Sequence, residues 1–183
     1  HLLLGILARS EGNGKEARSH HELAVQSDPQ VARAHYELGI SCNQLGDNEA
    51  AEASFAKAVD LEPEAGNYWY GYGDLLRLMG RLEESAAAYR QSVRLQPENA
   101  TAWERLGEVL ISTEQLSSAA KALKRGIGKV ENPRLYFLLA KVYAKANKDR
   151  RARETLENYL DAAAEDAPDR AEAEEQLRRL QRD

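Results

Sequence analysis

The sequence is poor in cysteine and has no long apolar stretch. Its 183 residues include one cysteine, Cys42, so an internal disulfide framework is excluded. No apolar run approaches the roughly 18 residues that a membrane-spanning helix requires, and we expect no membrane insertion. The opening segment HLLLGIL lacks a starting methionine and a basic lead, which argues against a secretion signal. These absences favour a soluble, cytoplasmic protein, although no residue specifies the compartment.

Proline is scarce as well, with five copies, and three of them are evenly spaced. Pro29, Pro63 and Pro97 stand 34 residues apart. Two series of glycines share this period, namely Gly5, Gly39, Gly73 and Gly107, and Gly12, Gly46 and Gly80. Three series with one period indicate a repeat array, in which each unit is a supersecondary element that cannot bury its apolar face alone.

The repeating unit reads as two helices joined by a tight turn. With residue 32 as the first position, ring-bearing side chains occupy the fourth position in most copies, Leu or Tyr the seventh, and Gly or Ala the eighth. These positions share one face of a helix, and the small eighth residue lets a second helix approach closely. The second helix presents an inner stripe such as Ala51, Phe55 and Ala58. A glycine ends the first helix, and a proline closes the unit.

The pattern of Trp or His, Leu-Gly, Ala, Phe or Tyr, Ala and Pro at these offsets resembles the tetratricopeptide repeat family, over essentially the whole chain. The resemblance implies an all-α fold, an α-α superhelix (α-solenoid) of helix-turn-helix repeats. The predicted boundaries are 1–31 for a partial repeat, 32–65, 66–99, 100–132 and 133–166 for four more, and 167–183 for a C-terminal capping helix. Because the first repeat begins inside its first helix, we expect the native protein to continue upstream.

The fourth repeat departs from the pattern. Gly126 replaces the usual Ala of the second helix, and Glu114 replaces the glycine of the turn. Pro133 follows Pro97 by 36 residues instead of 34. We therefore expect an irregular junction before the fifth repeat.

The sequence shows no pattern typical of catalysis or metal binding. His20 and His21 are adjacent, so they point in different directions on a helix and lack partners at zinc-ligand spacing. The segment GNGKE does not complete a phosphate-binding loop. The segment NAT at 99–101 is expected to cap a helix through Thr101 rather than to be glycosylated. Cys42 falls on a core-facing position with no base beside it. We expect no catalytic residue, no metal site and no cofactor, and the chain is not predicted to be an enzyme.

The family resemblance also implies a binding surface. In the family, the first helix of each repeat lines a concave face, and positions two, five, nine, twelve and thirteen form the stripe opposite its core residues. Aromatic, amide and cationic side chains on this stripe are types enriched at binding surfaces. The predicted partner-binding residues are Arg33, Tyr36, Ile40, Asn43, Asn67, Tyr70, Asp74, Arg77, Arg105, Arg134, Phe137 and Lys141. For Tyr36, Tyr70 and Phe137, the alternative is packing between adjacent first helices.

The charge distribution narrows the kind of partner. The net charge is −5, yet residues 121–153 hold eleven Lys or Arg against Glu131 and Asp149. Arg134 and Lys141 are expected to give this end of the groove a positive potential and to favour a partner with an acidic end. Pairing of both residues with Glu108 is the alternative. Nucleic acid is disfavoured because the protein is acidic overall and shows no ladder of exposed aromatics.

The functional prediction is a non-catalytic interaction scaffold that binds a peptide or protein segment in the concave groove. The chaperone-tail clamp of the family is absent, since only Arg105 coincides with one of its residues. Two alternatives stay open. The chain is a regulatory or docking domain of a larger protein, enzymatic or not, or it is a self-assembly module that forms a homo-oligomer.

Overall fold

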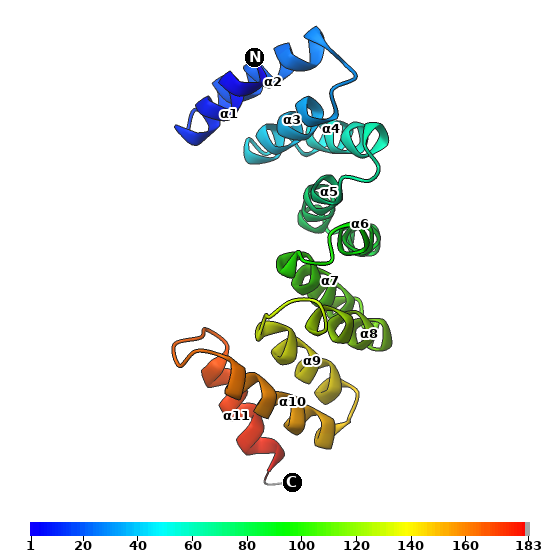
Figure 1. Cartoon of the computed structure of the whole chain (residues 1–183), viewed down its shortest axis with the longest axis vertical. Coiled ribbons are helices and arrows are strands. Elements are labelled where there is room, and N and C mark those ends of the chain that lie inside the picture. Colours follow the sequence, from blue (N-terminus) through cyan, green and yellow to red (C-terminus); the bar gives the residue numbers. More distant parts are fainter. Residues whose placement is uncertain (182–183) are drawn as a thin grey trace. The chain divides into compact units, whose positions relative to one another are not determined.

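The computed structural model describes residues 1–181 and shows only helices in this part of the chain (Figure 1). The chain forms two compact units, His1–Gln96 and Pro97–Asp183. The first unit contains α1 (Leu2–Ser10), α2 (Gly14–Ser27), α3 (Ala32–Gln44), α4 (Asn48–Leu61), α5 (Gly66–Leu78) and α6 (Leu82–Leu95). The second contains α7 (Ala100–Ser112), α8 (Leu116–Ile127), α9 (Arg134–Lys145), α10 (Asp149–Ala162) and α11 (Arg170–Leu180).

The helices pack in consecutive pairs, in which α1, α3, α5, α7 and α9 are the first helices and the next even-numbered helix is the second. Each pair lies within one of the repeat spans that the sequence predicts, and we retain those boundaries as a proposal. The linkers before α3, α5 and α7 have four residues, whereas residues 128–133 join α8 to α9. The structure therefore shows the longer junction that the displaced Pro133 indicates.

A small residue facing a large one closes each of the first four pairs. A Cβ atom added to Gly73 would lie 3.0 Å from the ring of Tyr89, and one added to Gly39 would lie 3.0 Å from Phe55. At the same repeat positions, Gly107 faces Leu123 and Gly5 faces His21. The absence of a side chain in the first helix makes room for the buried side chain of the second, which explains the eighth-position glycines.

The ring at the fourth position ties α3, α5 and α7 to the proline that precedes each of them. The indole nitrogens of Trp69 and Trp103 donate to the carbonyl oxygens of Pro63 and Pro97, both at 2.8 Å. His35 Nε2 lies 3.0 Å from the carbonyl oxygen of Pro29 and must carry the proton to donate there. The shared period of proline and ring-bearing residues thus reflects one hydrogen bond that recurs along the chain.

The turns between paired helices use the left-handed conformation at every repeat. Gly12, Gly46 and Gly80 have φ values of 83°, 79° and 77°. Glu114 and Asn147 take the same conformation with φ of 56° and 53°. Glu114 therefore adopts the backbone geometry of the glycine it replaces, at a steric cost that glycine avoids.

The cap of α7 differs from the expectation for the NAT segment. The side chain of Asn99 accepts a hydrogen bond from the backbone N–H of Ala102 at 3.0 Å, so Asn99 is the capping residue. Thr101 lies inside α7 and is exposed. The helix-cap interpretation holds, but the residue predicted to make the cap was wrong, because the helix begins at Ala100 rather than after Thr101.

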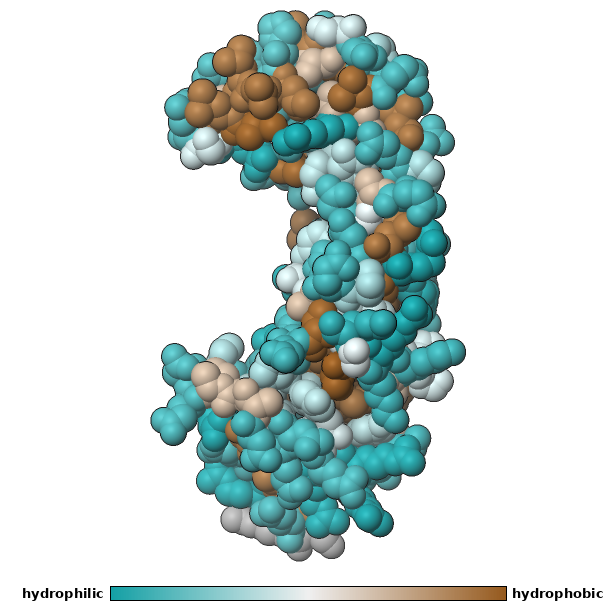
Figure 2. All heavy atoms as spheres, in the orientation of Figure 1, coloured by the Kyte–Doolittle hydropathy of each residue, from teal (hydrophilic) through white to brown (hydrophobic). Residues whose placement is uncertain are grey.

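Exposed leucines gather on α1. Leu3, Leu4 and Leu7 are 76%, 50% and 53% exposed, and Figure 2 shows apolar surface over this helix. Ser41 and Leu75 stand at the position of Leu7 in the next two repeats, and both are fully buried. In α3 and α5 this face packs against the preceding helix pair, as the contacts of α2 with α3 and of α4 with α5 show.

Candidate functional site

In the first unit, the predicted groove residue Tyr36 takes part in packing. Its ring centroid lies 5.6 Å from that of Phe55 and 4.7 Å from that of Tyr68. A Cβ atom at Gly71 would come within 2.8 Å of the Tyr36 ring. Burial raises the pKa of the Tyr36 hydroxyl. Tyr36 therefore packs between neighbouring helices, which was the alternative to partner binding. A Tyr36→Ala change would remove ring contacts inside the unit as well as any contact with a partner.

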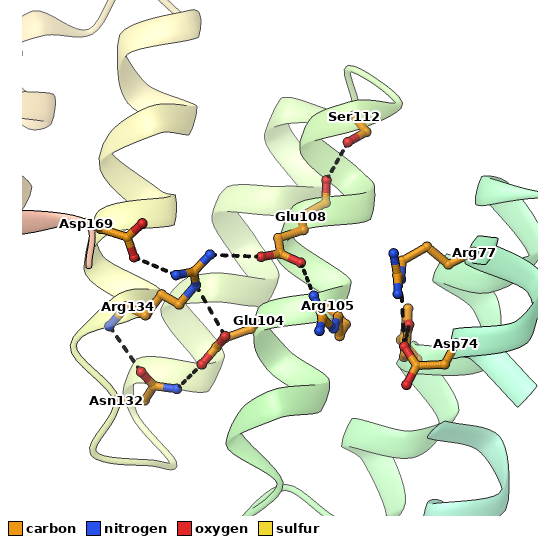
Figure 3. A network of polar contacts seen from close by, with 10 residues as sticks. Asp74, Arg77, Glu104, Arg105, Glu108, Ser112, Asn132, Arg134 and Asp169 are labelled. Carbon is orange, nitrogen blue, oxygen red and sulfur yellow. Dashed lines mark hydrogen bonds and ion pairs between the residues drawn. The ribbon is translucent and has the colours of Figure 1, made fainter. Parts of the chain in front are cut away.

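Tyr70, Asp74 and Arg77 are all positioned around the second helix of their own pair. The Tyr70 ring lies 5.9 Å from that of Tyr89. The Tyr89 hydroxyl donates to Asp74 Oδ1 at 2.6 Å. Arg77 Nε lies 3.7 Å from the same oxygen, and Figure 3 shows these two charged residues. Burial, followed by the hydrogen bond to Asp74, raises the pKa of Tyr89. Asp74 therefore positions a buried tyrosine in addition to presenting charge at the surface.

The other predicted residues of the first unit vary in exposure. Arg33 and Asn67 are exposed, and Asn43 is half-buried. Ile40 is half-buried and packs against the cluster that contains Cys42, Phe55 and Leu75. These four residues supply a mostly polar stripe, with Ile40 as its aliphatic member.

In the second unit, Arg134 lies at the centre of a network of carboxylates (Figure 3). Its guanidinium is 2.6 Å from Asp169 Oδ2, 3.3 Å from Glu108 Oε1 and 3.3 Å from Glu104 Oε2. Asn132 donates to Glu104 at 2.5 Å and accepts from the Arg134 backbone N–H at 3.0 Å. The network joins α7 and α9 to Asp169, the residue before α11.

The network changes the expected role of Arg134. Pairing with Glu108, the alternative for this residue, is present. Three carboxylates surround the guanidinium, so its charge is balanced locally and the positive potential expected from Arg134 is not available to a ligand. Arg105 also contacts Glu108, with Nη1 donating to Oε2 at 2.9 Å. The carboxylates that complete this arrangement, Glu104 and Asp169, were not among the predicted site residues.

A pocket of about 590 Å³ lies beside this network. Most of its lining residues occupy the groove-stripe positions of α7 and α9, and the remainder comes from Leu138 and from α11. The lining residues are Glu108, Ile111, Ser112, Arg134, Phe137, Leu138, Lys141, Ala144, Lys145, Gln176, Arg179 and Leu180. The pocket thus combines apolar walls with several cationic side chains, and it brings together Arg134, Phe137 and Lys141 of the predicted set.

Phe137 is not the exposed aromatic that the sequence predicted. It is 1% exposed and belongs to a buried cluster with Ala140, Leu156, Tyr159 and Ala173. Its ring centroid lies 5.3 Å from that of Tyr159. Side chains of α10 and α11 cover it. Its ring therefore packs beneath the pocket and is not an exposed aromatic surface for a partner.

Lys141 lies over this buried ring. Its Nζ atom is 4.5 Å from the centroid of Phe137 and 3.0 Å from Glu172 Oε1 of α11. Such a cation over an aromatic face is held in place by the ring's negative potential. The alternative for Lys141 was pairing with Glu108, but its carboxylate partner is Glu172, because α11 lies against α9.

The contribution of α11 to the pocket was missed. The sequence predicted a capping helix from Ala173, Leu177 and Leu180, and these side chains do pack against the cluster around Phe137. An amphipathic stripe shows that one face is buried but does not show which residues beside the stripe will border a cavity. Nothing in the sequence around Gln176 and Arg179 predicts that these two residues border the pocket.

Within residues 1–181, no group of three or more His, Cys, Asp or Glu is arranged to hold a metal ion. Burial raises the pKa of the Cys42 thiol, which lowers its reactivity at neutral pH. No helix in this part of the chain has the length and apolar character needed to cross a membrane.

Comparisons with known proteins agree with the repeat architecture. A family model described as tetratricopeptide repeat matches residues 2–65, and one described as TPR repeat matches residues 73–113, together more than half of the chain. No curated protein matches the sequence.

Solved structures with a similar fold include three with high coverage. MamA has a TM-score of 0.79 and 20% identity, covering 87% of this chain and 94% of that one. YrrB, described as a TPR protein with an unusual peptide-binding site, has a TM-score of 0.79 and 19% identity, with coverage of 97% and 90%. PilF of Pseudomonas aeruginosa has a TM-score of 0.73 and 19% identity, with coverage of 98% and 86%. At this identity the likeness establishes the all-α repeat fold.

Proposed function

Because the chain belongs to the tetratricopeptide repeat family, we propose that it is a non-catalytic scaffold that binds a peptide or protein segment along the groove stripe of its first helices. A role in protein interactions follows from the family. Binding through the stripe is the finer proposal, and the peptide-binding site named for YrrB, a protein of similar fold, is consistent with it.

The observation that carries the proposal is the pocket in the second unit. Eight of its lining residues occupy groove-stripe positions of α7 and α9, the positions that the family resemblance implies for a binding surface. Pockets of a few hundred Å³ with mostly apolar walls and a few charged groups are typical ligand sites. Ile111 and Ala144 provide half-buried apolar surface without being part of the buried cluster around Phe137.

Peptides selected from an unbiased display library should bind the chain through this pocket. Ile111→Glu places a charge in the apolar wall and is expected to lower the affinity of the selected peptides by about tenfold or more, as for the loss of a central interface residue. Affinities are measured by fluorescence anisotropy. Ser118→Glu, which also adds one negative charge at an exposed position of α8, is the matched control and should leave affinity unchanged.

The unfolding transition of each variant, followed by circular dichroism, checks that the fold is intact. A library that yields no binding peptide would contradict the proposed function. Selected peptides that bind the parent chain and Ile111→Glu equally well would move the site away from the pocket.

A second candidate function, self-association, is favoured by the exposed leucines of α1. Leu3 and Leu7 occupy a face that is buried against a neighbouring helix pair in α3 and α5. Contiguous exposed apolar surface of this kind commonly marks an interaction site. Sedimentation equilibrium should show concentration-dependent dimers, and Leu3→Glu combined with Leu7→Glu should give monomers. A parent chain that is monomeric at every concentration would eliminate this candidate.

A further inference from the structure

The helix α11 forms one wall of the pocket in addition to covering the last helix pair. Gln176, Arg179 and Leu180 line the pocket together with residues of α7 and α9. Leu180 also packs against the cluster around Phe137, which fixes this wall to the core of the unit. A ligand in the pocket therefore contacts α11 directly.

Two ion pairs link the α11 segment to α9. Asp169, which precedes α11, accepts from Arg134 at 2.6 Å. Glu172, in the first turn of α11, lies 3.0 Å from Lys141. Apolar packing of Ala173, Leu177 and Leu180 positions the wall along its length, and the ion pairs add contacts at one end. This arrangement presents a preformed site, which limits the ordering cost of binding.

The cationic side chains of the pocket are accessible to a ligand. Lys141 and Lys145 stand one turn apart on α9, and Lys145 is exposed. Arg179 of α11 also lines the pocket and is exposed. Lys141 and Arg179 pair with Glu172 and Glu175, whose side chains are 49% and 59% exposed. Such exposed pairs contribute little stability, so a ligand carboxylate can replace them at low cost.

Glu172 shows where a carboxylate can lie. Its Oε1 atom is 3.0 Å from Lys141 Nζ, while the same nitrogen lies over the Phe137 ring. A carboxylate is therefore accommodated next to the apolar walls formed by Ile111, Ala144 and Leu180. The combination fits a segment in which an acidic residue stands close to a bulky apolar residue.

We propose that the pocket between α7, α9 and α11 binds a bulky aliphatic or aromatic side chain from an acidic segment of a partner protein, while Lys141, Lys145 and Arg179 contact the carboxylates of that segment. This inference rests on the proposed function and names the chemistry of its ligand. The volume of about 590 Å³ is sufficient for a large side chain and part of its backbone.

Three synthetic peptides labelled with fluorescein test the ligand chemistry. The first carries one leucine and one phenylalanine flanked by glutamates, the second replaces the glutamates with glutamines, and the third replaces the two apolar residues with alanines. The first peptide should bind at least about tenfold more tightly than either of the others. Its affinity should also fall as salt is added, because the lysine contacts are exposed to solvent.

Charge-reversal variants test the residues. Lys145→Glu and Arg179→Glu should each weaken binding of the acidic apolar peptide several-fold, whereas Lys145→Arg should retain it. Lys121→Glu makes the same change of net charge on α8 and should have no effect. The melting temperature of each variant confirms that α11 stays docked.

The outcomes separate this inference from the proposed function. If library-selected peptides bind through the pocket but the glutamine peptide binds as tightly as the glutamate peptide, the acidic chemistry is wrong and the scaffold function stands. If Arg179→Glu has no effect while Lys145→Glu does, α11 is not part of the site. Tighter binding of a single-stranded oligonucleotide through the same lysines would also overturn the inference.

Discussion

A Gly73→Leu variant is expected to lose about 3 kcal/mol of unfolding free energy, at the upper end of the cost of overpacking a close-packed core. A Cβ atom at this position would lie 3.0 Å from Cδ1 and Cε1 of Tyr89, and a leucine adds three further carbons beyond it. The ring cannot move aside freely, because it is fully buried and its hydroxyl donates to Asp74. Urea denaturation followed by circular dichroism measures the change.

Two further variants test whether overpacking against Tyr89 causes the loss of stability in Gly73→Leu. Gly14→Ala is the control, because a Cβ atom there meets Leu45 at 3.5 Å, an ordinary contact, so the variant should unfold at nearly the same urea concentration as the parent chain. Combining Gly73→Leu with Tyr89→Ala should recover part of the loss if the two side chains compete for one space. An unchanged urea midpoint for Gly73→Leu would show that α5 and α6 do not approach as closely as the structure has them.

Acidification from pH 6.5 to 4 is expected to destabilise the first unit through His21. This side chain has no exposed surface. Its Nδ1 lies 2.9 Å from Ser41 Oγ, and Nε2 has no hydrogen-bond partner among the residues that the structure describes. Burial, together with the positive charges of Arg9 and His20, lowers the pKa of His21 to about 4.

The direction of the pH effect on stability follows from the difference in proton binding between the folded and the unfolded chain. The unfolded chain binds a proton at His21 below about pH 6.5, whereas the folded chain resists it until about pH 4. The stability contributed by the neutral ring is complete above pH 6.5 and falls as the pH drops. A shift of this size corresponds to a loss of about 3 kcal/mol at most. Asp47 remains charged through most of this range, because hydrogen bonds from Ala50 and Arg18 lower its pKa.

His21→Phe is the control for this pH dependence. Phe55 and Tyr89 occupy the same repeat position and face Gly39 and Gly73, so an aromatic ring is compatible with the site. Urea midpoints measured across the pH range should fall less steeply for the variant than for the parent chain. Parallel profiles would assign the acid sensitivity to groups other than His21.

The repeat period predicted the contacts that recur and missed those that occur once. Pairs such as Gly73 with Tyr89 can be predicted from residues that reappear at 34-residue spacing, because the two helices of each repeat pack in the same way. The ion pair of Arg134 with Asp169 joins a repeat to a helix outside the pattern, and nothing in the period indicates it. The same holds for Gln176 and Arg179, whose place at the pocket depends on how α11 docks.

Burial was the other quantity that the sequence did not determine. The fifth-position residues Tyr36 and Phe137 share a helix position, yet one is half-buried and the other is fully covered. The difference comes from the neighbouring elements, since α10 and α11 enclose Phe137 whereas Tyr36 contacts Tyr68 of α5. Helical periodicity specifies a direction from the helix axis but not what stands in that direction.

The two tryptophans of the sequence make each compact unit separately visible to fluorescence spectroscopy. Trp69 lies in the first unit and is half-buried, and Trp103 lies in the second and is 1% exposed. Both indole nitrogens donate to a proline carbonyl, so the polarity around the rest of each ring distinguishes them. Trp103 should emit at shorter wavelength than Trp69, and replacing either one with phenylalanine leaves a single reporter for the unfolding of one unit.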